Sequence, residues 1–274
     1  SMTSARAARF WPSRTAASVC WLDDDFALGT RAQAYRALGQ YDRALRDLDT
    51  MIAARPADIP LKLQRISILE QAGRTAEAEA EMDALAAADP AGAGVLLNQA
   101  ALKLQRGNAQ AASDILDRLL ATAPESNPSA LVLRGEASIE LGRLDLAERD
   151  FATVREAHPA DANILNNLCW TAATAGVLLD QALRDCEAAL AVAPDNPGIL
   201  DSRGRVLLQQ GDPEGAIVAY EAALAIAPEL PASLYGRGLA RIALGRVEEG
   251  EADKAAAIAI EPLTAEDFES YPPR

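Results

Sequence analysis

Glycine recurs along the chain at intervals of 34 or 35 residues, and this period limits the fold more than any other feature. The glycines that mark it are Gly39, Gly73, Gly107, Gly142, Gly176, Gly211 and Gly245. An alanine or glycine follows five residues after each, except that the gap after Gly176 is six, and a proline closes each unit. Three coupled signals at one period indicate an array of similar units instead of a domain with one central core.

Each unit is predicted to contain two helices joined by a turn. Apolar residues recur at helical spacing before each glycine, as at Leu165, Leu168 and Ala172. Glycine can adopt the left-handed conformation that ends a helix, and proline stops the second helix because it cannot continue the hydrogen-bond ladder. One hairpin of this kind cannot bury its apolar face alone, so neighbouring hairpins must stack.

The pattern resembles the tetratricopeptide repeat family, whose unit is a helix-turn-helix of about 34 residues with a small residue at its eighth position. That position holds a small residue in six units and Ile66 in the second. The resemblance implies an all-α fold, a right-handed α-solenoid of about seven repeats with short capping segments. We expect an N-terminal extension or cap over 1–24, a C-terminal cap over 265–274, and repeats over 25–58, 59–92, 93–127, 128–161, 162–196, 197–230 and 231–264.

The two ends of the chain differ from the repeats. Ser1 precedes Met2, which we interpret as an expression remnant, so we expect the native N-terminus to be missing. We expect Trp11 or Trp21 to pack on the first repeat. Thr264 and Asp267 form a capping-box-like start to a short helix, whose Phe268 and Tyr271 would cover the last hairpin.

Little in the sequence supports catalysis or a cofactor. The single histidine, His158, lies beside a proline in a predicted turn, and one histidine with three separated cysteines gives no zinc-ligand spacing. The net charge of −14 disfavours binding to nucleic-acid phosphates and would suit a basic partner. We therefore expect a protein that is not an enzyme, binds no metal or cofactor, contacts no nucleic acid, and has no membrane span.

Arginine and an acidic residue recur 16 residues apart within several repeats, at positions that would lie on opposite helices of one hairpin. The pairs are Arg31 with Asp47, Arg65 with Glu81, Arg134 with Asp150, and Arg237 with Asp253. In the fifth repeat the arginine is absent but the acid remains as Asp185. We predict that these pairs are ion pairs that join the two helices of a hairpin, each contributing about 0 to 1 kcal/mol if partly exposed.

The resemblance also implies where a ligand would bind, because the first helices of such repeats line a concave groove. The groove positions of repeats five to seven hold amides, aromatics and charges: Asn163, Asn166, Asn167, Trp170, Asp201, Arg205 and Tyr235. Asparagine can hydrogen-bond a peptide backbone, and Trp, Tyr and Arg are enriched in binding hot spots. The alternative for Trp170 is packing on a neighbouring helix, stacked by Arg205, with no ligand.

Cys169 and Cys186 occupy positions of the fifth repeat that face each other across the hairpin in this family. We expect their sulfurs to lie close, provided that the extra residue of this repeat lies after Gly176, near Leu178. They would be buried thiols in a reducing compartment and could form a disulfide in an oxidising one. The sequence leaves the compartment open between a cytoplasm and a bacterial periplasm.

Three functions remain from the sequence. The first is a scaffold that binds a peptide or partner helix of another protein in the groove. The second is an accessory module of a larger bacterial envelope enzyme, since "LNNLCW" and "ILDSRG" resemble the repeat tails of some bacterial transglutaminase-like proteins. The third is a structural solenoid that self-associates through its ends as a homo-oligomer.

Overall fold

The computed structural model describes residues 15–122 and 127–269, and all regular elements in these ranges are helices. Consecutive helices pack in pairs, α1 with α2, α3 with α4, α7 with α8, α9 with α10, α11 with α12 and α13 with α14, so the predicted all-α solenoid is confirmed. The chain divides into two compact units, residues 1–99 and residues 100–274, with the boundary inside α5 (Ala93–Gln105).

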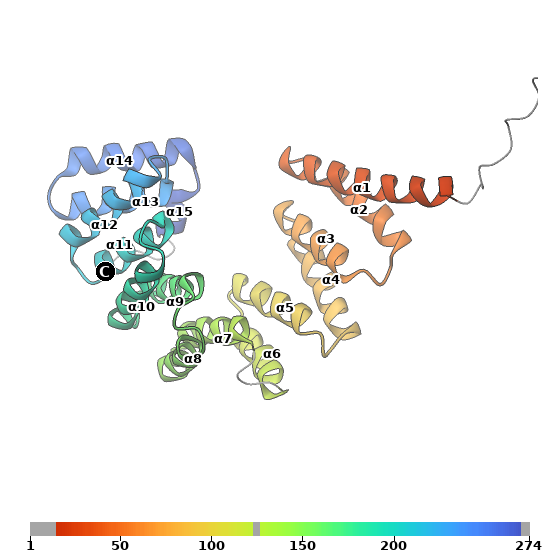
Figure 1. The fold of residues 1–274 in the computed structure, drawn as a ribbon, viewed down its shortest axis with the longest axis horizontal. Helices are drawn as coiled ribbons and strands as arrows, with labels where there is room; N and C mark the ends of the chain where they lie inside the picture. The colour runs from red at the N-terminus through yellow and green to blue at the C-terminus, as the bar shows by residue number, and fades with distance from the viewer. Residues whose placement is uncertain (1–14, 123–126, 270–274) are drawn as a thin grey trace, which may run out of the picture. The chain divides into compact units, whose positions relative to one another are not determined.

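The first unit contains two described hairpins and the start of a third. Its helices are α1 (Thr15–Ala37), α2 (Tyr41–Ala54), α3 (Ile59–Gln71) and α4 (Thr75–Ala88), followed by the first half of α5. Figure 1 shows α1 packed along α2 and α3 along α4. Residues 15–24 of the predicted extension are continuous with the first helix, whereas Trp11 and the side chain of Trp21 lie outside the described residues.

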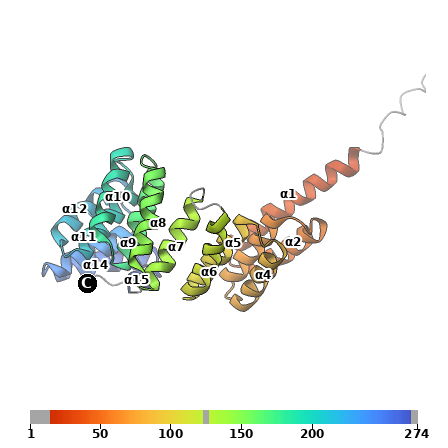
Figure 2. The same ribbon diagram turned by 90° about the horizontal axis from the view of Figure 1, so that it is seen from below.

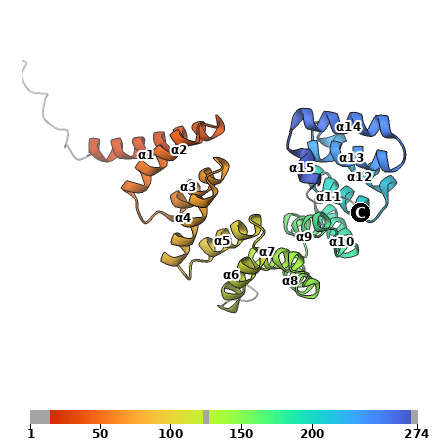
Figure 3. The ribbon, with the colours of Figure 1, turned by 180° about the vertical axis from the view of Figure 1, so that it is seen from behind.

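In the second unit the first helices of neighbouring hairpins contact one another, α7 with α9, α9 with α11 and α11 with α13, and Figure 2 shows α7, α9 and α11 in this order. After α6 (Ala109–Thr122) come α7 (Pro128–Glu140), α8 (Leu144–Ala157), α9 (Ala162–Ala175), α10 (Leu179–Val192), α11 (Pro197–Gln209), α12 (Pro213–Ile226), α13 (Pro231–Ala243) and α14 (Val247–Ile260). A short final helix, α15 (Thr264–Glu269), packs against both α13 and α14 (Figure 3).

The turn in each hairpin has the predicted glycine geometry. All seven glycines of the 34- or 35-residue period have positive φ, between 66° and 79°, which is the left-handed region that L side chains disfavour. In the fifth repeat, Leu178 also has a positive φ of 52°, and no other described non-glycine residue does. The extra residue of this repeat therefore lies between Gly176 and α10, where the sequence placed it.

Small residues allow the helices of the second unit to approach closely. Tyr220 is completely buried, and a Cβ atom added at Gly204 would lie 2.7 Å from its ring. A Cβ added at Gly238 would lie 2.7 Å from the backbone oxygen of Gly250. Since backbone cannot move aside as a flexible side chain can, the α13–α14 contact requires glycine at this position.

The predicted ion pairs join the two helices of their hairpins. Arg31 binds Asp47 and Arg237 binds Asp253, each through two hydrogen bonds of 2.7 and 2.8 Å, and Arg134 binds Asp150 in the same way. Arg65 contacts Glu81. Where the fifth repeat lacks its own arginine, Arg155 on α8, the second helix of the preceding repeat, binds Asp185 instead, at 2.6 and 3.0 Å.

Candidate functional site

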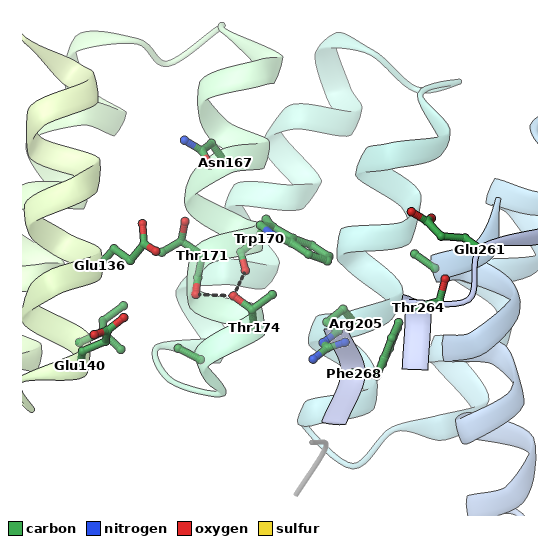
Figure 4. A pocket seen from close by; sticks show the side chains of 13 residues that line it. Glu136, Glu140, Asn167, Trp170, Thr171, Thr174, Arg205, Glu261, Thr264 and Phe268 are labelled. Atoms are coloured by element: carbon green, nitrogen blue, oxygen red, sulfur yellow. Dashed lines mark hydrogen bonds between the residues drawn. The ribbon is translucent and has the colours of Figure 1, made fainter. Parts of the chain in front are cut away.

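The second unit contains a cavity of about 590 Å³ on the first helices of three successive hairpins, α7, α9 and α11 (Figure 4). The segment from the end of α14 to α15 closes one side of it. The polar and aromatic residues of its wall are Glu136, Glu140, Asn167, Trp170, Thr171, Thr174, Arg205, Glu261, Thr264 and Phe268. Cavities of this size with a few convergent polar groups are typical of ligand sites.

Helical periodicity explains why these side chains meet. On α9, Asn167, Trp170, Thr171 and Thr174 are three or four residues apart and therefore share one face of the helix. The opposite face carries buried residues such as Leu168. Glu136 and Glu140 are one turn apart on α7 and face the same cavity. The hydroxyl of Thr174 donates to the carbonyl oxygen of Trp170 at 2.9 Å, so it is bound within its own helix.

The predicted groove residues fall into three groups. Asn167, Trp170 and Arg205 line the cavity, although Arg205 is buried. Asn163 and Asn166 lie on α9 outside the cavity wall, the first exposed and the second half-buried. Asp201 and Tyr235 are buried.

Trp170 is the most accessible of these aromatic residues. Its side chain is 37% exposed and stands between the α7 wall and the α15 wall in Figure 4. Arg205 lies beside Phe268 on the α15 side in that view. The guanidinium carbon of Arg205 lies 4.2 Å from the centre of the Phe268 ring, so Arg205 stacks on Phe268. The alternative considered from the sequence was that it stacks on Trp170.

For Phe268, the sequence predicted only part of the contacts that the structure shows. It was expected to cover the last hairpin, and its ring does lie 4.9 Å from that of Tyr235 on α13. It also reaches across to Arg205 on α11 and closes one end of the cavity. Tyr271 lies outside the described residues. The predicted capping box is wrong in one respect, because the buried hydroxyl of Thr264 has no hydrogen-bond partner in the described part of the chain.

The two acidic residues on α7 are among the wall residues that the sequence did not single out, together with Thr171, Thr174 and Glu261. Burial raises the pKa of Glu136, and the neighbouring charge of Glu140 raises it further. Burial also raises the pKa of Glu140. The sequence could have indicated Glu136, because it occupies the same position in its repeat as Trp170 does in the next repeat.

A polar cluster is buried between α11 and α13. The hydroxyl of Ser233 donates to Asp201 at 2.6 Å, and Asp201 is 7% exposed. Burial raises the pKa of Asp201 to about 6, although the Ser233 hydrogen bond and the charge of Arg205 act in the other direction. Burial likewise raises the pKa of Tyr220, and the charge of Asp201 adds to that shift.

Cys169 and Cys186 are joined by a disulfide that links α9 to α10, with their Cα atoms 5.5 Å apart. Both residues are completely buried. Cys169 precedes Trp170, so the bond fixes the helix that carries the exposed indole. The two sulfurs were expected to lie close if the extra residue of the fifth repeat lies after Gly176, and Leu178 in that turn meets this condition.

Neither a metal site nor a membrane span is found in the described ranges. No group of three histidine, cysteine or acidic residues among them could hold a metal ion. None of the helices there combines the length and the apolar character that crossing a bilayer requires.

The sequence matches family models of tetratricopeptide repeats. A family model described as tetratricopeptide repeat matches residues 30–93 and 97–162, and one described as TPR repeat matches residues 204–245. Together these matches cover more than half of the chain. No curated protein sequence gives a significant match.

Solved structures share the fold at low sequence identity. A tetratricopeptide repeat protein from Parabacteroides merdae is 18% identical with a TM-score of 0.67, over 90% of this chain and 98% of that chain. A thermophilic TPR protein in Thermus thermophilus is 22% identical with a TM-score of 0.52, over 64% and 95%. PilW, a type IV pilus biogenesis factor, is 19% identical with a TM-score of 0.52, over 64% and 80%.

Proposed function

Because the chain belongs to the tetratricopeptide repeat family, whose repeats form protein–protein interaction scaffolds, we propose that it holds a peptide segment of a partner protein in the cavity on α7, α9 and α11. A chain built of these repeats is typically a non-catalytic scaffold. The observation that carries the proposal is the exposed indole of Trp170 in the wall of a cavity of about 590 Å³.

The chemistry of the wall supports an extended peptide as the ligand. The amide of Asn167, one turn from Trp170, can both donate to and accept from a peptide backbone. An aromatic anchor in a recess, with polar groups beside it, is the arrangement found at binding hot spots. The disulfide behind α9 holds this wall in place before binding, which lowers the entropy cost of association.

Affinity capture from a lysate of the source organism tests the proposal. We expect Trp170→Ala combined with Asn167→Ala to weaken partner binding by at least about 2 kcal/mol, roughly thirtyfold. Val218→Ala on α12 is the matched control, because Val218 is 64% exposed and lies outside the cavity. If the double variant and the control recover the same partners equally well, the cavity is not the binding site.

Self-association is the second candidate, favoured by the exposed apolar residues of α14. Val247, Ile258 and Ile260 of this helix are 53%, 39% and 46% exposed. Exposed apolar surface on the outside of a protein can mark an interface, and α14 would provide it between two copies. Ile258→Glu with Ile260→Glu should then convert a dimer to a monomer in sedimentation equilibrium, and a wild-type chain that is already monomeric at high concentration would contradict this candidate. The accessory-module alternative stays a prediction.

A further inference from the structure

We propose that the cavity selects partner segments that present a lysine or arginine side chain, which enters between the carboxylates of α7 and the indole of Trp170. This inference rests on the proposed function and specifies its ligand. It commits to one occupant, a cationic side chain of a protein partner.

The first support is an acidic wall with no cation of its own. Glu136 and Glu140 line the cavity from the same face of α7, and no ion pair to either is present among the described residues. The buried carboxylates of Asp150 and Asp185 in this unit each have an arginine, Arg134 at 2.7 Å and Arg155 at 2.6 Å. A carboxylate pair that is partly desolvated and mutually repulsive gains from a cation placed between them.

Trp170 supplies the second wall. A lysine or arginine over the face of an indole is attracted by the quadrupole of the ring, and tryptophan is the strongest of the aromatic residues in this respect. Trp170 lies on α9, the next first helix after α7, and Figure 4 shows it between the α7 carboxylates and the α15 wall. The methylene groups of a long cationic side chain would also cover its exposed surface.

Arg205 does not supply the missing positive charge. It is 2% exposed, and its guanidinium stacks on Phe268 at the opposite side of the cavity from Glu136 and Glu140. The charge of Arg205 also acts on the buried Asp201. Glu136 and Glu140 therefore have no cationic partner among the described residues, and we infer that a bound segment supplies one.

Thr264 gives an independent indication of a ligand. Its side chain is 3% exposed and lines the same cavity, and its hydroxyl oxygen has no hydrogen-bond partner in the described part of the chain. Burying a hydroxyl without a hydrogen bond is unfavourable, and a donor or acceptor of a bound ligand would remove that cost. Thr264 lies on the α15 side of Trp170 in Figure 4, so a backbone group of the same partner segment, next to its cationic side chain, would satisfy this oxygen.

Charge complementarity agrees with a basic ligand. The net charge of the chain is −14, and Glu261 adds a third carboxylate to the cavity wall. A surface of this sign accelerates the approach of basic segments and repels acidic ones.

The test uses short blocked glycine–serine peptides with one central arginine, lysine or citrulline, since citrulline keeps the shape of arginine and loses its charge. Trp11→Phe with Trp21→Phe leaves Trp170 as the single indole of the three, so its fluorescence reports binding. We expect the arginine or lysine peptide to bind at least about tenfold more tightly than the citrulline peptide. Comparing the affinities of the arginine and lysine peptides shows which of the two side chains the cavity prefers.

Glu136→Gln with Glu140→Gln should remove this preference, whereas Glu156→Gln with Glu187→Gln, two exposed residues outside the cavity, removes the same charge and should preserve it. Equal affinity for the arginine, lysine and citrulline peptides would overturn the inference, as would no binding of either cationic peptide. Partner capture that Trp170→Ala abolishes and Glu136→Gln with Glu140→Gln leaves intact would overturn it too, while leaving the proposed function standing.

Discussion

Phe268 covers Arg205: the guanidinium carbon lies 4.2 Å from the centre of the ring. The two residues are separated by further hairpin helices and their turns, so α15 returns across α13 to reach α11. The same ring contacts Tyr235 at 4.9 Å. One aromatic side chain thereby ties three helices together and bounds the cavity.

Phe268→Ala should detach α15 from the unit. Truncation of a buried phenylalanine in a core costs about 3–5 kcal/mol, but α15 is six residues long and can unfold locally, so we expect about 1–3 kcal/mol. Amide hydrogen exchange should speed up in α15 and around Tyr235. Leu263→Ala, at a residue 59% exposed, is the control and should change stability by about 0.5 kcal/mol or less. If amide hydrogen exchange in α15 is unchanged in the Phe268→Ala variant, the contacts of Phe268 with Arg205 and Tyr235 do not hold α15 in place.

Arg155→Ala should be more disruptive than its surface position suggests. Its partner Asp185 is 3% exposed, and the hydrogen bond from Gln181 at 3.0 Å cannot neutralise its charge. Leaving a buried carboxylate without its cation should cost about 2 kcal/mol, measured by chemical denaturation. Arg149→Ala removes an exposed arginine of the same helix and should cost about 0.5 kcal/mol or less. Similar losses in the two variants would contradict the role of Arg155.

The repeat architecture could be predicted because its signals are local. The positive φ of Gly176 and the placement of the extra residue at Leu178 follow from turn geometry within a few residues. The pairing of Arg134 with Asp150 follows from a fixed offset within one hairpin. Each of these relationships repeats along the chain, so one copy predicts the next.

Contacts between different repeats were harder to predict, since they depend on how far each side chain reaches across the stack. Trp170 and Asn167 were predicted to face a groove and do line the cavity, but the burial of Asp201 and Tyr235 was not foreseen. The pairing of Arg155 with Asp185 crosses a repeat boundary, and Phe268 spans two repeats. No fixed offset within one repeat encodes either contact.

The disulfide should stabilise the second unit. Cys169 and Cys186 are separated by 17 residues, and closing a loop of that size contributes about 3 kcal/mol in the chain-entropy model. We expect Cys169→Ser with Cys186→Ser, or reduction, to lower the melting temperature. Thiol titration under denaturing conditions should find one free thiol of the three cysteines. Three free thiols would show that the bond is absent in that preparation.

Asp201 should make stability depend on pH. Its pKa is raised from 3.8 to about 6 by burial, so the folded state binds its proton more tightly than the unfolded state does. The resulting stabilisation is fully present below about pH 4 and is lost as the pH rises toward 6, a change of about 3 kcal/mol for a shift of about two units.

Asp201→Asn keeps an oxygen that can accept from Ser233 and carries no charge at any pH. Its stability relative to wild type should therefore rise by about 2 kcal/mol between pH 4 and pH 7, as measured by chemical denaturation at both values. Glu136 and Glu140, whose pKa values are also raised, are present in both proteins, so their contributions cancel in the difference. A difference that stays constant between the two pH values would mean that Asp201 is already ionised in the folded protein at pH 4.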